Sequence, residues 1–219
     1  MKSALCLLAA AVSLAAGSAR AQMMPCCAPP QTPEQALFRS IENGEFGEFT
    51  RLVDTGVPLS ATNGHGETPL YLAAEKGQVE MAKLLIAKGA DTHALTPNGE
   101  SVLHAAAMIE SAALMSSLIE AGADKNLANR DGETPLHWAA MTGTFLAVKA
   151  LADAGADLDV QDARTGNTAL HAAVSHDDIV LIHYLLSKNV RTDIRNKDGA
   201  TALEFAESRG RGSVKLFER

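Results

Sequence analysis

Short apolar blocks alternate with polar, glycine-containing turns along most of the chain. The block that begins at Pro69 follows Thr68, so a hydroxyl N-cap precedes a proline at the first helical position. This block ends at Gly77, and glycine readily takes the left-handed conformation at a helix C-terminus. A second apolar block ends at Gly89. Its candidate core positions are Val79, Ala82, Leu84, Leu85 and Ile86. The pattern predicts two short helices joined by a glycine turn.

This pair of blocks recurs with a period of 33 residues, apart from one interval of 34. A hydroxyl residue starts each first block, at Thr68, Ser101, Thr134, Thr168 and Thr201. A glycine lies two residues before each of them, at Gly66, Gly99, Gly132, Gly166 and Gly199. A leucine lies two residues after each, at Leu70, Leu103, Leu136, Leu170 and Leu203. Such self-similarity is typical of a solenoid of stacked repeats. Polar stretches such as the one from Asn129 to Gly132 predict tight hairpins between the repeats.

Two segments, Gly66 to Ala74 and Gly132 to Ala140, resemble the signature of the ankyrin repeat. The second blocks are similar to that family too, because three of them end in Gly-Ala-Asp, at residues 89–91, 122–124 and 155–157. The resemblance covers about residues 33–217. It implies an all-α ankyrin-repeat solenoid of stacked antiparallel helix pairs with β-hairpin or turn connections. Because this repeat is a scaffold, the resemblance is more specific for the fold than for the function.

We expect about six repeats in a domain that spans residues 33–219. Their predicted limits are 34–62, 63–95, 96–128, 129–162, 163–195 and 196–217. The first and last repeats diverge, as is usual for terminal repeats that shield the core from water. The fifth repeat holds an extra residue near Arg164, and Glu110 and Asp177 replace the glycine that ends the first helix elsewhere. We interpret these departures as tolerated drift, with a local bend or a specificity feature as the alternative.

The N-terminus has the pattern of an export signal. Lys2 precedes an uncharged apolar run from Ala4 to Ala16, and Ala19-Arg20-Ala21 offers small residues at a cleavage site. The run is shorter than the roughly 20 residues needed to span a bilayer. The sequence therefore predicts a signal peptide over residues 1–21, cleaved after Ala21, and a proline-rich leader over residues 22–32. An uncleaved anchor is the alternative. The expected product is periplasmic or secreted, with no membrane insertion after cleavage.

Charge and cysteine content narrow the class of protein. The formal net charge is −7, and loss of Lys2 and Arg20 with the signal makes it −9, so we expect no nucleic-acid partner. Only Cys26 and Cys27 remain after cleavage, and consecutive cysteines rarely form a disulfide with each other. The domain is therefore not predicted to be a disulfide-stabilised scaffold.

Candidate catalytic chemistry is sparse. The chain contains no nucleophile elbow, phosphate-binding loop or Cys-x-x-Cys motif, so we expect neither an enzyme nor a cofactor. His104, His137 and His171 occupy one repeat position and invite a catalytic interpretation. The ankyrin resemblance implies instead that this histidine is a structural fastener, which bonds to the cap hydroxyl and to neighbouring backbone.

Two clusters of possible metal ligands are present. His171, His176 and His183 lie near Asp177 and Asp178 in the sequence. Zinc needs three or four ligands that converge in a tetrahedron, and these residues straddle a helix–loop–helix turn. The leader contains sulfur groups suited to thiophilic ions, at Met23, Met24, Cys26 and Cys27. We expect no bound metal. An envelope protein that handles metal or redox chemistry through Cys26 and Cys27, or through the His171–His183 cluster, is the alternative function.

The resemblance implies that a concave surface, formed by the hairpins and the first helices, binds another protein. Candidate contact residues on the hairpins are His65, Glu67, Glu100, Arg130, Asp131, Glu133, Arg164 and Asn167. Candidates on the first helices and at their C-terminal ends are Met108, Ile109, Trp138, Met141, Thr142 and His176. Trp138 is the only tryptophan, a residue type that is enriched in interface hot spots, and a core-filling role is the alternative.

The predicted function is therefore non-catalytic recognition of a partner protein by a monomeric module. A scaffold, an inhibitor or an immunity-type protein would each need tight binding and no chemistry. The hairpins are acidic in the early repeats and basic near Arg164 and Lys197. A partner with the opposite charge gradient would be steered into place.

Overall fold

The computed structural model describes residues 32–210 and 212–217, which belong to one compact unit. The predicted signal peptide, residues 22–31 of the predicted leader and the four sulfur-containing residues within them lie outside the described residues. The described part of the chain forms eleven α-helices and one 3-10 helix and contains no β-strand. The predicted all-α solenoid of helix pairs is confirmed.

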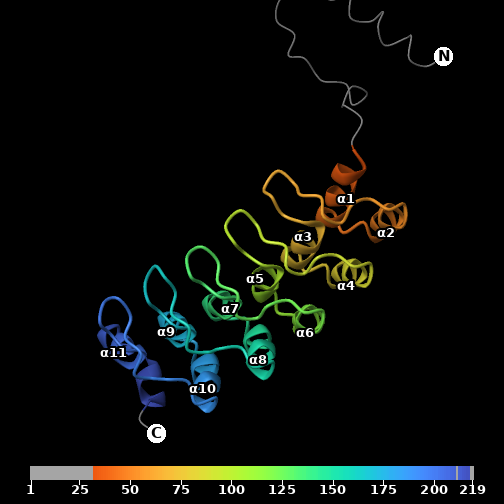
Figure 1. The fold of residues 1–219 in the computed structure, drawn as a ribbon. Helices are drawn as coiled ribbons and strands as arrows, with labels where there is room; N and C mark the ends of the chain where they lie inside the picture. The colour runs from red at the N-terminus through yellow and green to blue at the C-terminus, as the bar shows by residue number, and fades with distance from the viewer. Residues whose placement is uncertain (1–31, 211, 218–219) are drawn as a thin grey trace, which may run out of the picture. The chain divides into compact units, whose positions relative to one another are not determined.

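The helices form two rows, as Figure 1 shows. The inner row lies next to the hairpins and contains α1 (Pro33–Glu42), α3 (Pro69–Glu75), α5 (Val102–Ala107), α7 (Pro135–Thr142), α9 (Ala169–Ser175) and α11 (Ala202–Ser208). The outer row contains α2 (Phe46–Asp54), α4 (Val79–Ala87), α6 (Ala112–Glu120), α8 (Phe145–Asp153) and α10 (Ile179–Ser187). A 3-10 helix, η2 (Gly212–Leu216), takes the outer place in the last pair.

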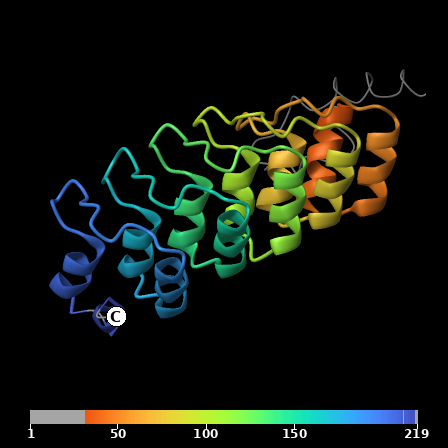
Figure 2. The same ribbon diagram turned by 60° about the horizontal axis from the view of Figure 1, so that its bottom comes forward.

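Each inner helix packs against the next inner helix, so the repeats follow one another in chain order, side by side in Figure 2. None of the described helices combines the length and the apolar character needed to cross a membrane, and the longest has 10 residues.

Local capping chemistry sets the limits of the helices. Thr68 accepts a hydrogen bond from the backbone N–H of Tyr71 at 3.2 Å, and Pro69 occupies the first helical turn. The outer helices end before a residue in the left-handed region, as at Gly89 with φ +81° and at Asn189 with φ +57°. Asparagine thus takes the place of glycine at this position of the fifth repeat, because it also tolerates the left-handed conformation.

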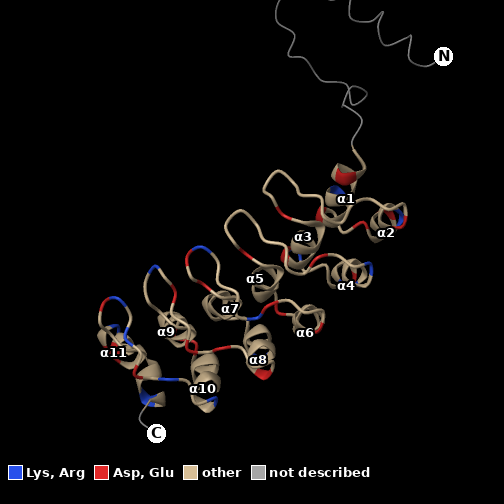
Figure 3. Ribbon diagram, viewed as in Figure 1, with Lys and Arg blue, Asp and Glu red and all other residues tan. Residues whose placement is uncertain are grey.

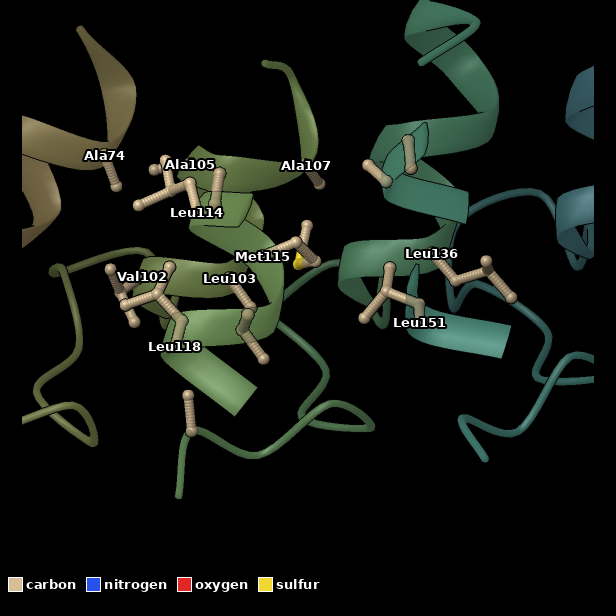
Figure 4. Packing of buried hydrophobic residues seen from close by; sticks show 14 of the residues in the cluster. Ala74, Val102, Leu103, Ala105, Ala107, Leu114, Met115, Leu118, Leu136 and Leu151 are labelled. Atoms are coloured by element: carbon tan, nitrogen blue, oxygen red, sulfur yellow. The ribbon is translucent and has the colours of Figure 1, made fainter. Parts of the chain in front are cut away.

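The hydrophobic core lies between the two rows. Leu103, Leu114 and Leu118 are fully buried on α5 and α6, and Figure 4 shows them together with Met115. The inner helices carry many buried alanines, including Ala105 on α5, which let neighbouring repeats approach closely. Every repeat thus buries its apolar side chains partly against its own helix pair and partly against the next, as expected for a solenoid.

The hairpins are tight turns closed by two backbone bonds each. In the third repeat the N–H of Thr96 donates to the carbonyl of Glu100 at 3.0 Å, and the N–H of Gly99 donates to the carbonyl of Thr96 at 2.8 Å. The bonds do not extend into a strand ladder, so the described residues have turns in place of the β-hairpin form of the prediction. Neighbouring hairpins are also joined, because the N–H of Arg130 donates to the carbonyl of Asn98 at 3.0 Å.

Glu110 and Asp177 tie their repeats to the next one. The Glu110 carboxylate accepts a hydrogen bond from the backbone N–H of Leu146 at 2.9 Å, at the start of α8, whose N-cap Thr144 makes no side-chain capping bond. Asp177 adopts a left-handed φ of +54°, and its carboxylate accepts from the N–H of Ser213 at 3.2 Å, within η2. Both residues therefore satisfy backbone donors of the next repeat, which is a structural role for the two departures from the repeat pattern.

Candidate protein-binding surface

Three equivalent histidines fasten consecutive repeats together. The His104 ring accepts at Nδ1 from the backbone N–H of Ser101 at 3.0 Å, so its Nε2–H donates to the Glu133 carbonyl of the next repeat at 2.9 Å. His137 and His171 repeat this arrangement. Burial lowers the pKa of each ring below its ordinary value. With both nitrogens bonded and the rings buried, these histidines have the structural role that the resemblance implies.

A small hollow, the apolar cup, opens on the inner face, which is the surface made by the inner helices and hairpins. Met108, Glu133, Trp138, Met141 and Thr142 line its volume of about 240 Å³, and the sequence analysis had selected all five. Met108 is 37% exposed and Met141 is 45% exposed, although both are large apolar side chains. Flexible, polarisable methionines suit a surface that adapts to an apolar partner group.

The Trp138 indole is held in one orientation. Its Nε1–H donates to the Glu133 carboxylate at 2.8 Å, and its ring meets the His104 ring edge-on, with centroids 5.3 Å apart and planes at 81°. The side chain is half-buried: it packs against the preceding repeat and also lines the cup. The ring therefore fills space beside the preceding repeat and keeps one side open to the cup, and its role as a binding hot spot stays a prediction.

A second, polar hollow of about 140 Å³ adjoins the cup and shares Glu133 and Met141 with it. Arg164, Asn167 and His176, all selected from the sequence, line it. The Arg164 guanidinium lies 4.0 Å from the Glu133 carboxylate, and its side chain is 67% exposed, so water weakens this ion pair.

Asp162 lines the same hollow and was missed in the sequence analysis. Its carboxylate accepts hydrogen bonds from the backbone N–H groups of Arg164, Thr165 and Asn167 and from the Thr165 hydroxyl. Burial alone would raise the pKa of Asp162, but these bonds outweigh it and the pKa lies below its ordinary value.

The sequence does contain a signal for Asp162, because the equivalent position of every other hairpin also holds a hydrogen-bond acceptor. Asn63, Thr96, Asn129 and Asn196 accept from the hairpin N–H groups in the other repeats. The two oxygens of a carboxylate accommodate the longer turn of the fifth repeat, which holds the extra residue.

The remaining selected residues lie outside the two hollows. His65, Arg130 and Asp131 are exposed on hairpins. Glu67 and Glu100 are half-buried at the hairpin bases. Ile109 is half-buried and packs beside Gly77 of the preceding repeat.

The predicted histidine cluster does not converge. His171 is buried with both ring nitrogens bonded, whereas His176 and His183 are exposed on different elements. The described residues contain no group of three or more His, Cys, Asp or Glu side chains that could hold a metal ion. The three histidines therefore do not form a converging set of ligands, while Cys26 and Cys27 lie outside the described residues.

Charge is distributed unevenly over the hairpins. Figure 3 shows acidic residues at the hairpin bases that lead into α3 and α5, where Glu67 and Glu100 lie. The hairpins that lead into α7, α9 and α11 carry both signs, because Asp131, Asp162 and Asp198 accompany Arg130, Arg164 and Lys197. The charge therefore changes from acidic hairpins in the second and third repeats to hairpins of mixed charge in the later ones.

Comparisons with known proteins agree with this architecture. A family model described as ankyrin repeats (3 copies) matches residues 82–162 and 147–218, and a second, ankyrin repeats (many copies), matches residues 52–107. A search of curated protein sequences found no match. Among solved structures, the chain is similar to the ankyrin repeat domain of Bcl-3, which is described as a unique member of the IkappaB protein family. The two share 28% sequence identity, the alignment covers 87% of each chain, and the TM-score is 0.76.

Proposed function

Because the chain belongs to the ankyrin-repeat family, whose repeats are protein-interaction scaffolds, we propose that it recognises a partner protein through its inner face, without catalysis. The observation that carries the proposal is the apolar cup. Two exposed methionines and a tryptophan held by Glu133 and His104 surround it. A rigid aromatic ring loses little conformational entropy on binding, which is why such rings act as anchors.

Binding alone suffices for the role that we propose. A partner seated across several repeats would have its own surface covered, as an inhibitor or an immunity-type protein requires. It would equally be held beside other molecules, as a scaffold requires. The structure supplies a continuous frame for this task, since each fastening histidine joins one repeat to the next.

The site of action that we propose is the periplasm or the secreted space. The proposal rests on the signal pattern of residues 1–21. N-terminal sequencing of the protein recovered from its source cell tests it. A mature chain that starts at Gln22 supports export, and an intact Met1 in the cytoplasmic fraction contradicts it.

Affinity purification with matched variants tests the binding proposal. The bait is the full-length protein, compared with a double variant, Trp138→Ala with Met141→Ser, that empties the cup. Leu146→Ala is the control, because Leu146 is 37% exposed and lies on the outer helix α8, outside the cup.

The expected result is one partner that the wild type and the control retain and the cup variant loses. In titrations with that purified partner, the cup variant should bind at least about tenfold more weakly, equivalent to about 1.4 kcal/mol. Equal affinity for the cup variant would rule out this surface.

A further inference from the structure

A row of glutamates leads to the apolar cup from the side of the second and third repeats, and its last member, Glu133, lines the cup. Glu67, Glu100 and Glu133 occupy one repeat position at the base of consecutive hairpins. The described bonds to the first two come from neutral donors. Asn63 donates to Glu67 at 2.7 Å, and Tyr71 and Thr96 donate to Glu100 at 3.1 and 3.0 Å. Neutral donors orient a carboxylate and leave its charge in place.

These carboxylates act on the same region of the inner face. Burial raises the pKa of Tyr71 above its ordinary value, and the negative charges of Glu100 and Glu67 raise it further. The negative charges of Glu100 and Glu133 both act on the buried His104 ring, where they oppose the larger lowering of its pKa by burial. The His104 ring in turn packs on Trp138. Negative potential therefore extends from the second repeat up to the edge of the cup.

On the opposite side of the cup the charges are mixed, because Asp162 and Glu133 line the polar hollow together with Arg164. Glu133 already has Arg164 at 4.0 Å, and Lys197 lies one hairpin further on, with its ammonium group bonded to the Ala163 carbonyl. A cationic partner group would meet these positive charges there. A cationic group of a partner is therefore favoured on the Glu100 side of the cup and disfavoured on the Arg164 side.

The geometry points to a partner segment in which an apolar side chain fills the cup and a lysine or arginine, two or three residues away, bonds to Glu100. This inference rests on the proposed function and specifies the partner's chemistry. The spacing follows from the fold. Packed helices such as α5 and α7 lie about 8–10 Å apart, and an extended chain rises about 3.3 Å per residue. A peptide lying across the two inner helices therefore places such a pair of side chains on neighbouring repeats.

A selection from a phage-displayed library of random dodecapeptides tests the inference. The full-length protein is the target, and enriched peptides are synthesised and titrated by fluorescence anisotropy. Each peptide is measured against the wild type, Glu100→Gln, Trp138→Ala and the outer-helix control Leu146→Ala. Circular dichroism melting of each variant verifies that it is folded.

The expected peptides carry Lys or Arg two or three residues from Leu, Met, Ile or Phe. They should bind about tenfold more weakly to Glu100→Gln, lose measurable binding to Trp138→Ala and bind the control as the wild type. Increasing salt should weaken binding to the wild type more than to Glu100→Gln, because only the wild type keeps the ionic contact.

Two other outcomes would overturn the inference, and they differ in whether the proposed function is rejected with it. Peptides that need Trp138 but lack a basic residue, or that bind Glu100→Gln equally well, would reject the partner chemistry and leave the proposed function standing. Peptides that ignore Trp138→Ala, or a library with no enriched peptide, would reject both.

Discussion

The fourth and fifth repeats share a frame and differ in what they build on it. Both use a threonine and a histidine to cap the inner helix and to fasten the next repeat, through Thr134 and His137 in one and Thr168 and His171 in the other. Where the fourth repeat has the half-buried Trp138, the fifth has the buried Ala172. The fourth repeat therefore places a large aromatic ring at the inner face, and the fifth places a small buried side chain at the same position.

The hairpins of the fourth and fifth repeats also differ, in the residue that accepts hydrogen bonds from the turn and in the length of the turn. In the fourth repeat, Asn129 accepts from two backbone N–H groups of a short turn. In the fifth, the buried Asp162 holds a turn that is one residue longer. Asp177 then replaces Gly143 at the end of the inner helix and reaches η2. The fifth repeat thus uses its unusual residues for structure and the fourth uses Trp138 for its surface, which teaches that departures from a repeat pattern need contacts before they can be interpreted.

Of the four predictions, the largest loss of stability is expected at acidic pH, where the histidines that join the repeats become protonated. Because burial lowers the pKa of His104, His137 and His171, the unfolded chain takes up protons at a higher pH than the folded one. The free energy of unfolding should therefore fall progressively as the pH drops below about 6.5, because three buried rings resist protonation in the folded state. Urea titrations across this range check the prediction, and a flat profile would contradict it.

The contact between the two hairpins provides the next test. Gly132 has φ +74°, and a Cβ there would come within 2.5 Å of the Ala163 backbone nitrogen. Gly155 has a similar φ of +75°, with nothing within 4 Å of its added Cβ. We expect Gly132→Ala to cost about 2.5 kcal/mol and Gly155→Ala about 1 kcal/mol, since only the first adds a backbone clash to the conformational strain. Equal losses in denaturant melts would show that the hairpins do not touch.

Exchanging the hairpin acceptors should have a smaller effect. Asp162→Ala removes the acceptor of three backbone N–H groups and should lower stability by about 2 kcal/mol, against about 1 kcal/mol for Asn129→Ala. Because the pKa of Asp162 is lowered in the fold, its contribution is present above about pH 3.9 and is lost as the pH falls below that value. Melting curves of both variants above and below this pH separate the two hairpins, and identical losses would remove the special role of the carboxylate.

The smallest effect is expected at Asp177. Asp177→Gly relieves a left-handed conformation that is unfavourable for aspartate and also removes the bond to Ser213. The two terms oppose each other, so the stability should change by less than about 0.5 kcal/mol. Amide hydrogen exchange should nevertheless quicken at residues 212–216, because η2 loses its tie to the fifth repeat. Unchanged exchange there would show that this bond does not hold η2.

Much of the fold could be predicted from the sequence because its determinants are local. A threonine cap, a proline one residue later and a glycine or asparagine in the left-handed region act within one helical turn. Their recurrence every 33 residues predicts the helix pairs and their stacking, and Asn189 shows that even a substitution keeps the same backbone conformation.

Contacts about one repeat apart were decided only by the tertiary structure. Glu110 reaches the first turn of α8, and Met108, Trp138 and Met141 close around one cup. The 33-residue spacing of Met108 and Met141 already predicted that both lie on the inner face, but the cup and the Glu110 bond depend on how two helix pairs are offset when their cores pack. The sequence by itself determined the repeat and the side chains that each repeat carries. The packing of one repeat on the next determined which of those side chains share a surface.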